Sequence, residues 1–171
     1  MIRFPIIILS VAAMIGILTF LLQGHVFLNI FTNSLPQGVY LRKDGGFVKE
    51  EYALTCLTQP IVEYGLERQY LRKGNCKTGI IPVGKVIKAV PGDTFSVINN
   101  VLKANGETFL IAQKDSAGRS LKRFYADGVY VLKQGEYLLL SDYVADSWDS
   151  RYWGPVNVEY LLKPWVIYGK K

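Results

Sequence analysis

The chain has 171 residues, 50% of them hydrophobic, which suits one compact domain with an additional apolar segment. Its formal net charge of +6 raises the question of a nucleic-acid or anionic-lipid partner. The basic residues are scattered among acidic ones and form no Lys/Arg block longer than two. We therefore interpret the charge as a solvated surface near an anionic membrane, and we expect no nucleic-acid partner.

The apolar segment lies at the N-terminus, where residues 4–22 carry no charge. At 1.5 Å per residue, about 19 helical residues cover roughly 28 Å, close to the ~30 Å of a bilayer's hydrocarbon core. A cleaved signal peptide would have a shorter apolar run and a small-x-small site after it, and residues 23–26 offer no such site. We expect an uncleaved transmembrane helix, with the anchor at residues 1–30 and an extracytoplasmic domain at residues 31–171. Arg3 before the span favours a cytoplasmic N-terminus.

Two cysteines, Cys56 and Cys76, are a disulfide candidate, because an even pair in an exported domain is typically oxidised. Closing that loop would stabilise the fold by roughly 3 kcal/mol. The sequence has no Cys/His cluster with metal-ligand spacing. We expect no metal and no cofactor.

Beyond residue 40 the chain reads as short strands separated by turns. Apolar and β-branched runs predict strands at residues 83–90, 95–98, 101–104, 128–132, 135–140 and 160–168. Asn105-Gly106 is a strong hairpin signal, and residues 133–134 are expected to join another strand pair. The polar segment 59–79 is interpreted as a loop pinned by the cysteines. The predicted fold is mainly β, an antiparallel β-sandwich or barrel-like domain after the transmembrane helix.

A first candidate functional residue is Ser34, about a dozen residues after the apolar run. Pro36 restricts Leu35 to an extended conformation, and Gly38 permits close backbone approach. The alternative is ordinary turn chemistry.

Lys85 and Lys88 form the second candidate site, in an apolar β-prone stretch. Because side chains alternate along a strand, we expect one of the two lysines to be buried and the other solvated. Burial would lower a lysine's pKa, as a general base requires. The alternative is a lysine that extends its amine to solvent at a sheet edge. The single histidine, His25, lies at the end of the apolar run, so we do not expect an imidazole base.

The third cluster, residues 141–154, holds three aspartates, three serines and one arginine. Asp149 and Arg151 could form a charge-assisted pair that fixes a loop, and the alternative is a polar turn.

These clusters, in this order, resemble the type I signal (leader) peptidase family of Ser-Lys membrane proteases. Ser34-Leu35-Pro36 resembles the family's Ser-Met-Pro box. Lys85 stands six residues before Pro91-Gly92-Asp93, as the family's lysine does, and residues 142–154 resemble its Ser-x-Asp-Ser-Arg box. The departures are Leu35 for methionine and Ser141-Asp142-Tyr143 for Gly-Asp-Asn. The Pro-Gln-Gly-Val-Tyr ending, the small size and the single anchor look more like the conjugative-transfer (TraF-like) branch.

The resemblance implies a role for each matching residue. Ser34 would be the nucleophile and Lys85 the general base, with Lys88 a bystander. Ser147 would orient the lysine, and Asp149 would pair with Arg151 to support the site. Thr32 would help the Ser34 N–H to form an oxyanion hole.

The implied function is a serine-type endopeptidase, single-pass in the bacterial inner membrane with its catalytic domain on the periplasmic side. Its substrate would be an exported precursor protein, most readily a conjugative pilin, matured with or without cyclisation. Inner-membrane lipid and type IV secretion or conjugation components are the other implied partners. Two alternatives stay open: a general type I signal peptidase, and a non-catalytic component of a secretion or conjugation complex.

Overall fold

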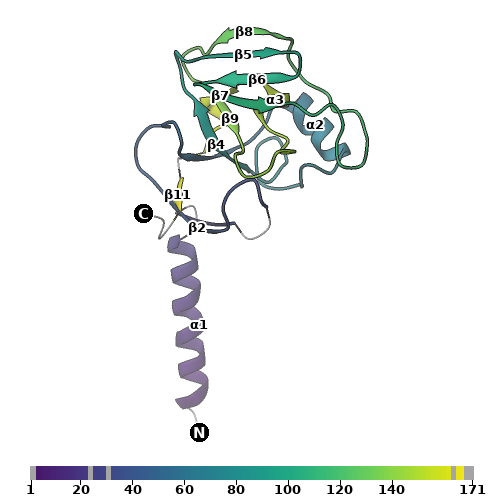
Figure 1. Ribbon diagram of the computed structural model, residues 1–171. Helices are drawn as coiled ribbons and strands as arrows, with labels where there is room; N and C mark the ends of the chain where they lie inside the picture. The colour runs from purple at the N-terminus through teal and green to yellow at the C-terminus, as the bar shows by residue number, and fades with distance from the viewer. Residues whose placement is uncertain (1–2, 23–24, 30–31, 163–164, 168–171) are drawn as a thin grey trace.

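Two antiparallel sheets form the body of the protein in the computed structural model, which describes residues 3–22, 25–29, 32–162 and 165–167 (Figure 1). In the described ranges the larger sheet has seven strands, in the order β1 (Val26–Asn29), β2 (Gly38–Arg42), β11 (Trp165–Ile167), β3 (Tyr52–Thr55), β4 (Val83–Ala89), β9 (Glu136–Leu140) and β10 (Val156–Asn157). The smaller has four, in the order β7 (Glu107–Leu110), β6 (Val101–Ala104), β5 (Thr94–Ile98) and β8 (Gly128–Val131). The helices are α1 (Arg3–Leu22), α2 (Gln59–Glu67), α3 (Ser150–Trp153) and the 3-10 turn η1 (Val158–Tyr160). The mainly β, antiparallel prediction is confirmed.

Strand β4 is central in the larger sheet because its apolar, β-branched residues suit a strand buried on both faces. It pairs with β3 on one side and with β9 on the other. The pairing with β9 shifts register between Ile87 and Ala89, so Lys88 is the extra residue of a β-bulge. The main hydrophobic core packs around β4, β5 and β9. A smaller core of Leu35, Tyr40, Leu54 and Val86 joins the N-terminal strands to β4.

Two local predictions were wrong. Residues 128–132 and 135–140 form strands, but β8 pairs with β5 and β9 pairs with β4, so the two strands belong to different sheets. The segment 59–79 is not all loop, because α2 occupies its first half. Pro60 lies in the first turn of α2, where a helix tolerates proline, and the helix is too short for a clear periodic signal.

Helix α1 covers the apolar run 4–22 within the predicted anchor of residues 1–30, and it projects away from the sheets (Figure 1). Its side chains are described from Ile7 to Leu21. Within the described residues no helix is long and apolar enough to cross a membrane, so the structure does not support the predicted transmembrane helix. Strand β1, which lies inside the range 1–30 assigned to the anchor, pairs with β2.

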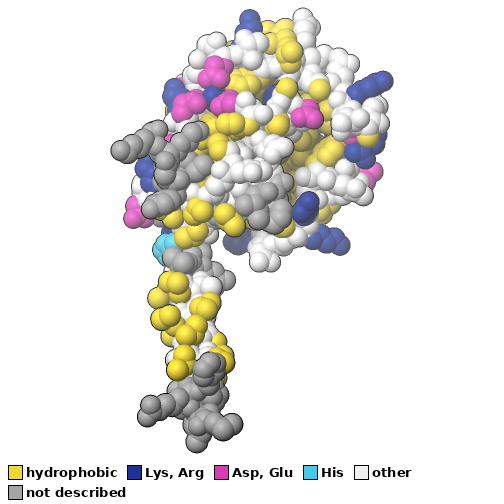
Figure 2. All heavy atoms as spheres, turned by 60° about the horizontal axis from the view of Figure 1, so that its bottom comes forward, with side chains coloured by type: hydrophobic (Ala, Val, Ile, Leu, Met, Phe, Trp, Pro, Cys, Tyr) yellow, Lys and Arg dark blue, Asp and Glu magenta, His cyan; other side chains and the backbone are white. Residues whose placement is uncertain are grey.

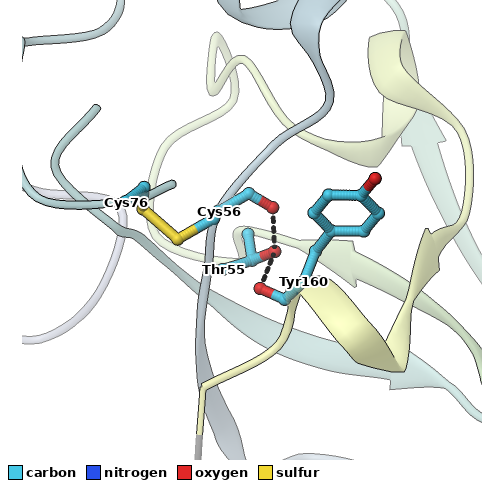
Figure 3. The surroundings of a disulfide bond; sticks show 4 residues. All are labelled: Thr55, Cys56, Cys76 and Tyr160. Carbon is cyan, nitrogen blue, oxygen red and sulfur yellow. Dashed lines mark hydrogen bonds between the residues drawn. A yellow bond between two sulfur atoms is a disulfide. The ribbon is translucent and has the colours of Figure 1, made fainter. Parts of the chain in front are cut away.

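A disulfide joins Cys56, just after β3, to Cys76 (Figure 3). The end of β3 is also hydrogen-bonded to η1. Thr55 Oγ1 donates to the Tyr160 carbonyl at 3.2 Å, and the Cys56 N–H donates to the same oxygen at 2.9 Å. The disulfide therefore ties the segment after α2 to the larger sheet.

Candidate active site

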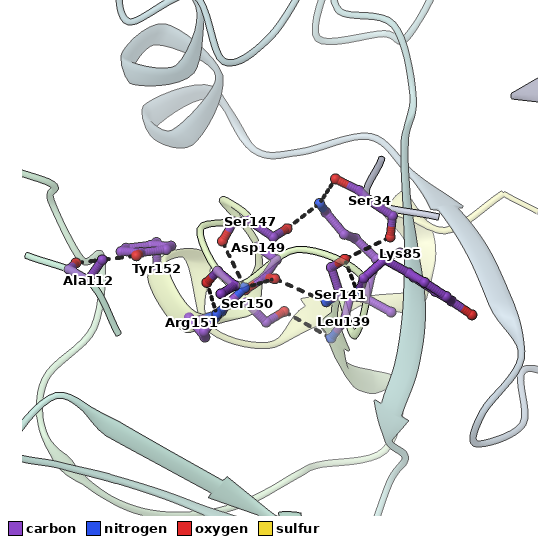
Figure 4. A network of polar contacts seen from close by, with 12 residues as sticks. Ser34, Lys85, Ala112, Leu139, Ser141, Ser147, Asp149, Ser150, Arg151 and Tyr152 are labelled. Carbon is purple, nitrogen blue, oxygen red and sulfur yellow. Dashed lines mark hydrogen bonds and ion pairs between the residues drawn. The ribbon is translucent and has the colours of Figure 1, made fainter. Parts of the chain in front are cut away.

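Lys85 lies near the start of β4, opposite Ala53 of β3 and before the point where β9 begins to pair. Its side chain is 2% exposed. Its Nζ donates to Ser34 Oγ at 2.9 Å and to Ser147 Oγ at 2.7 Å (Figure 4). The structure thus brings together three residues that lie far apart in the sequence.

Burial lowers the pKa of Lys85 to about 8. Asp149 acts in the opposite direction and raises this pKa, while Arg151 lowers it further. At pH 7, one unit below this pKa, about a tenth of the amine is therefore uncharged. An uncharged Nζ at this distance from a hydroxyl can accept its proton.

Ser34 is half-buried, and its segment is held from several sides. The carbonyl of Ser34 accepts a hydrogen bond from Ser141 Oγ at 2.8 Å. Asn29, 3% exposed at the end of β1, donates to the carbonyls of Leu35 at 3.0 Å and Pro36 at 3.1 Å. These bonds leave the Ser34 side chain as the part of the segment that faces Lys85.

Thr32 lies near Ser34, but its hydroxyl donates to Asn29 Oδ1 at 3.2 Å, and its N–H donates to the same oxygen at 3.3 Å. Asn29 in turn donates to the Thr32 carbonyl at 3.1 Å. The structure therefore places Thr32 in the turn that precedes Ser34, and its suggested contribution to an oxyanion hole stays a prediction.

Asp149 and Arg151 form a buried ion pair, 0% and 3% exposed. The guanidinium donates twice to the carboxylate, from Nε to Oδ1 and from Nη2 to Oδ2, both at 2.9 Å. Asp149 also caps α3 through the Arg151 N–H and accepts from the Ser141 N–H at 3.1 Å. Arg151 Nη2 donates to the Ser147 carbonyl at 3.1 Å. The pair thus fixes the backbone of the two serines that contact Ser34 and Lys85 (Figure 4).

Gly84, the neighbour of Lys85, is needed for close packing against the serine segment. A Cβ at this position would lie 2.6 Å from Leu35 Cδ1 and 3.3 Å from Leu54 Cδ2. Leu35 therefore docks on the backbone of β4 beside Lys85. This contact helps to explain why the residue after Ser34 is a buried leucine.

Lys88 was expected to be solvated if Lys85 is buried, and that expectation was wrong. Its side chain is 5% exposed, and its amine lies within 3.1 Å of carboxylate oxygens of Glu50, Glu107 and Asp142. Burial alone would lower the pKa of Lys88, but hydrogen bonds to these three carboxylates raise it above the usual value. Simple alternation missed this arrangement because residues 85–89 of β4 are all buried, so neither face of the strand leaves a lysine in solvent.

A cavity of about 520 Å³ opens beside Ser34 and Lys85. Its walls come from the serine segment, the residues after α2, the start of β4, the loop after β7 and the 144–148 segment. Apolar side chains that line it include Leu28, Leu35, Leu71, Ile81, Val83 and Trp148. The cavity is large enough for several side chains of an extended peptide.

Two residues of the site were missed by sequence reasoning. Asn29 organises the turn before Ser34, and its only signal was a polar residue that ends the apolar run 26–29. Ser141 was noted only as a departure from a glycine, yet its hydroxyl binds the Ser34 carbonyl. Among the described residues we find no cluster of histidine, cysteine, aspartate or glutamate side chains that could hold a metal ion.

A half-buried serine within hydrogen-bond reach of a buried, deprotonatable lysine is the arrangement of a serine hydrolase that uses no histidine. Comparison with known proteins agrees with this class. Residues 73–164 match the family described as signal peptidase, peptidase S26. The chain belongs to this family of signal peptidases, and membership indicates a serine peptidase.

Similar proteins include two from Escherichia coli that are named plasmid transfer protein TraF. One is 31% identical over 80% of this chain and 80% of its own length, and the other is 32% identical over 77% and 76%. A conjugal transfer protein TraF of Agrobacterium tumefaciens is 32% identical over 56% of this chain and 53% of its own length. A solved signal peptidase I from Enterococcus faecalis is 19% identical, with a TM-score of 0.37, over 71% of this chain and 97% of its own.

Proposed function

We propose that the protein is a Ser-Lys endopeptidase in which Ser34 attacks a peptide carbonyl and Lys85 accepts the Ser34 proton. The observation that carries the proposal is the position of Lys85 Nζ, 2.9 Å from Ser34 Oγ and 2.7 Å from Ser147 Oγ. Ser147 holds the amine on the line of proton transfer. After the attack, the protonated lysine can return the proton to the leaving amine, which leaves an acyl group on Ser34.

A lysine base predicts how the rate depends on pH. Only the uncharged amine of Lys85 can accept the proton, and its pKa is about 8. The cleavage rate should therefore rise with pH and level off above about pH 8. A rate that is flat from acid to neutral pH would count against lysine as the base.

The developing oxyanion needs hydrogen-bond donors near Ser34. We assign this role to the Ser34 N–H, with the Thr32 hydroxyl as a supporting group, as the resemblance suggested. Each such donor can be worth a few kcal/mol in the transition state. Thr32 lines the same cavity as Ser34 and Lys85, and its hydroxyl would have to turn away from Asn29 Oδ1 to donate to an oxyanion.

The names of the relatives support a role in conjugative transfer, and we propose an exported precursor, most readily a pilin subunit, as the substrate. An acyl-enzyme on Ser34 can be resolved in two ways. Water gives a shortened product, whereas the amine of the same substrate chain gives a cyclic one.

We further propose that α1 holds the enzyme at the periplasmic side of the bacterial inner membrane, where precursor proteins and transfer components meet it. The described part of α1 carries large apolar side chains that are mostly exposed, among them Ile8, Leu9, Met14 and Phe20 (Figure 2). Alkaline carbonate extraction of membranes tests this. The protein should stay in the membrane pellet. Its release into the supernatant would show that α1 does not anchor it in the membrane.

The catalytic proposal is tested by incubating the purified full chain, in detergent, with candidate pilin precursors from the same transfer system. Wild-type protein should cleave one of them, and Ser34→Ala should lose all cleavage above background. Ser120→Ala is the matched control, because Ser120 is exposed and lies outside the cavity lining. Unchanged cleavage by Ser34→Ala would overturn the assignment of the nucleophile.

The family description favours a second candidate, a general signal peptidase that removes signal peptides from exported proteins. Rescue of a conditional signal-peptidase mutant by this chain would support that reading. Cleavage of a pilin precursor without rescue would support the dedicated role. If neither precursor were cleaved, a non-catalytic component of the transfer apparatus would become the better interpretation.

A further inference from the structure

Lys88 lies at the centre of a cluster of three carboxylates. Its Nζ lies 2.9 Å from Glu50 Oε2, 3.1 Å from Glu107 Oε1 and 3.0 Å from Asp142 Oδ2. The carboxylates come from three places: the segment before β3, the first residue of β7 and the loop after β9. The Lys88 side chain is 5% exposed, whereas the side chains of its three partners are 60%, 48% and 34% exposed. The buried ammonium therefore depends on these carboxylates for compensation, while water can solvate the carboxylates.

Asp142 connects this cluster to the serine segment. The preceding residue, Ser141, donates from its hydroxyl to the Ser34 carbonyl at 2.8 Å. The Ser141 N–H donates to Asp149 Oδ2 at 3.1 Å. The loop that Lys88 holds through Asp142 is thus the loop that holds the backbone of Ser34.

A second route runs through the tyrosine that follows Asp142. Tyr143 and Tyr52 share a hydrogen bond between their hydroxyls at 3.1 Å. The Tyr52 ring packs edge-to-face on Tyr40 with centroids 5.3 Å apart, and Tyr40 donates to the Pro36 carbonyl at 2.6 Å. The 141–143 loop therefore reaches the serine segment on both sides of Leu35.

We propose that Lys88 is a positioning residue: by fixing Asp142, it holds the 141–143 loop against residues 34–36 and so sets the distance between the Ser34 hydroxyl and the Lys85 amine. This inference rests on the proposed Ser34 and Lys85 chemistry. It replaces the sequence-based view of Lys88 as a bystander. A misplacement of reacting groups by about 1 Å can cost up to a hundredfold in rate.

The kinetic test compares Lys88→Met with the charge-conserving Lys88→Arg and with Asp142→Asn. We expect kcat to fall about tenfold in Lys88→Met and in Asp142→Asn, with KM nearly unchanged, because the substrate cavity does not include either side chain. Lys88→Arg should restore most of kcat. The double variant Lys88→Met/Asp142→Asn should be no worse than either single variant, because both act through one contact.

Two controls separate positioning from loss of stability. Glu107→Gln removes the charge of another partner of Lys88, which belongs to β7 and not to the 141–143 loop, and it should leave kcat within about twofold. Lys43→Met removes a lysine that pairs with Glu51, outside the cluster, and should leave kcat unchanged. If Glu107→Gln and Asp142→Asn lowered kcat and the unfolding temperature alike, Lys88 would be only a structural ion-pair centre and the proposal would be wrong.

A titration of Lys85 by NMR gives a readout that needs no turnover. The charged groups that face Lys88 are Glu50, Glu107 and Asp142, so simple electrostatics predicts shifts of opposite sign: loss of the Lys88 cation raises the pKa of Lys85, and loss of the Asp142 carboxylate lowers it. Displacement of the serine segment instead admits water to Lys85 and raises its pKa in both variants.

The decisive variant is therefore Asp142→Asn, measured in the full chain in detergent micelles. A higher pKa of Lys85 supports the positioning role, and an unchanged or lower pKa overturns it. This outcome is independent of cleavage. If wild-type protein cleaved no precursor, the proposed function would fail, while the effect of Asp142→Asn on Lys85 would still decide whether Lys88 and Asp142 position the pair.

Discussion

The surroundings of Lys85 and of Lys88 differ in one respect, although the two lysines are three residues apart on β4 and almost equally buried. Lys85 contacts two hydroxyls, and the Asp149 carboxylate that acts on it is paired with Arg151. Lys88 contacts three carboxylates. Burial lowers the pKa of Lys85 to about 8, whereas the pKa of Lys88 is raised. Burial beside uncharged partners lowers the pKa of Lys85, whereas three carboxylates outweigh the effect of burial at Lys88, so Lys85 is the lysine that fits the proposed role of base.

The largest expected effect comes from removing the base. Lys85→Met keeps the length and apolar character of the side chain but cannot accept a proton, so the cleavage rate should fall about a thousandfold or more. This is measured as kcat/KM on the same precursor. Lys88→Met is the matched comparison, and its kcat/KM should fall only about tenfold. If kcat/KM fell equally in the two variants, Lys85 would have no special role as the base.

Removing Arg151 should make the surroundings of Lys85 more like those of Lys88. In Arg151→Met the buried Asp149 carboxylate loses its partner, which should lower the free energy of unfolding by about 3–5 kcal/mol. The uncompensated carboxylate should also raise the pKa of Lys85 and move the rise in rate to higher pH. Urea unfolding and a pH–rate profile measure the two effects.

Arg123→Met is the control for that prediction, because Arg123 pairs with Asp127, whose side chain is 45% exposed. Its loss should cost less than about 1 kcal/mol. A pKa of Lys85 that stayed unchanged in a folded Arg151→Met variant would show that the ion pair has no influence on the base.

A smaller effect should appear in the pH dependence of stability. The pKa of Lys85 is about 8 when folded, below the ~10.4 of a free lysine, so between these values the unfolded chain binds more protons and stability rises with pH. Lys85→Met should be more stable than wild type by about 3 kcal/mol below pH 8, and this advantage should shrink toward pH 10.

Lys88 should show the opposite sign. Its raised pKa contributes stability that is fully present below the pKa of a free lysine and is lost only at higher pH. Lys88→Met should therefore be less stable than wild type throughout pH 7–10. Urea unfolding of both variants across pH 7–10 checks these two predictions. If the free energy of unfolding of Lys85→Met exceeded that of wild type by the same amount at every pH, Lys85 would be charged in the folded protein.

The residues that the motifs singled out, Ser34, Lys85, Ser147, Asp149 and Arg151, lie together in the structure. The catalytic roles that the resemblance implied for them stay predictions. The features that the sequence did not indicate depend on long-range contacts. They are the burial of Lys88, the different sheets of β8 and β9, and the hydrogen bond from the Ser141 hydroxyl to the Ser34 carbonyl.

The pattern of polar and apolar residues also failed to predict helix α2 and the role of Asn29 at the end of β1. The nine residues of α2 are too few for helical periodicity to stand out, and its position depends on packing around Gly65, where a Cβ would lie 2.8 Å from Trp148. Asn29 looked like the end of an apolar run, since nothing local shows that three carbonyl oxygens converge on its amide.

The pairing of β2 with β11 has a consequence for biosynthesis. The strand that follows Ser34 is hydrogen-bonded to residues 165–167, and the carbonyl of Ser34 is held by residue 141. A nascent chain that has emerged only as far as Lys85 thus contains both reactive groups but lacks Ser147, Asp149 and the strand that supports the serine segment. On the proposed mechanism, the protein would stay inactive during its synthesis and would gain peptidase activity only after the late strands had joined the sheet.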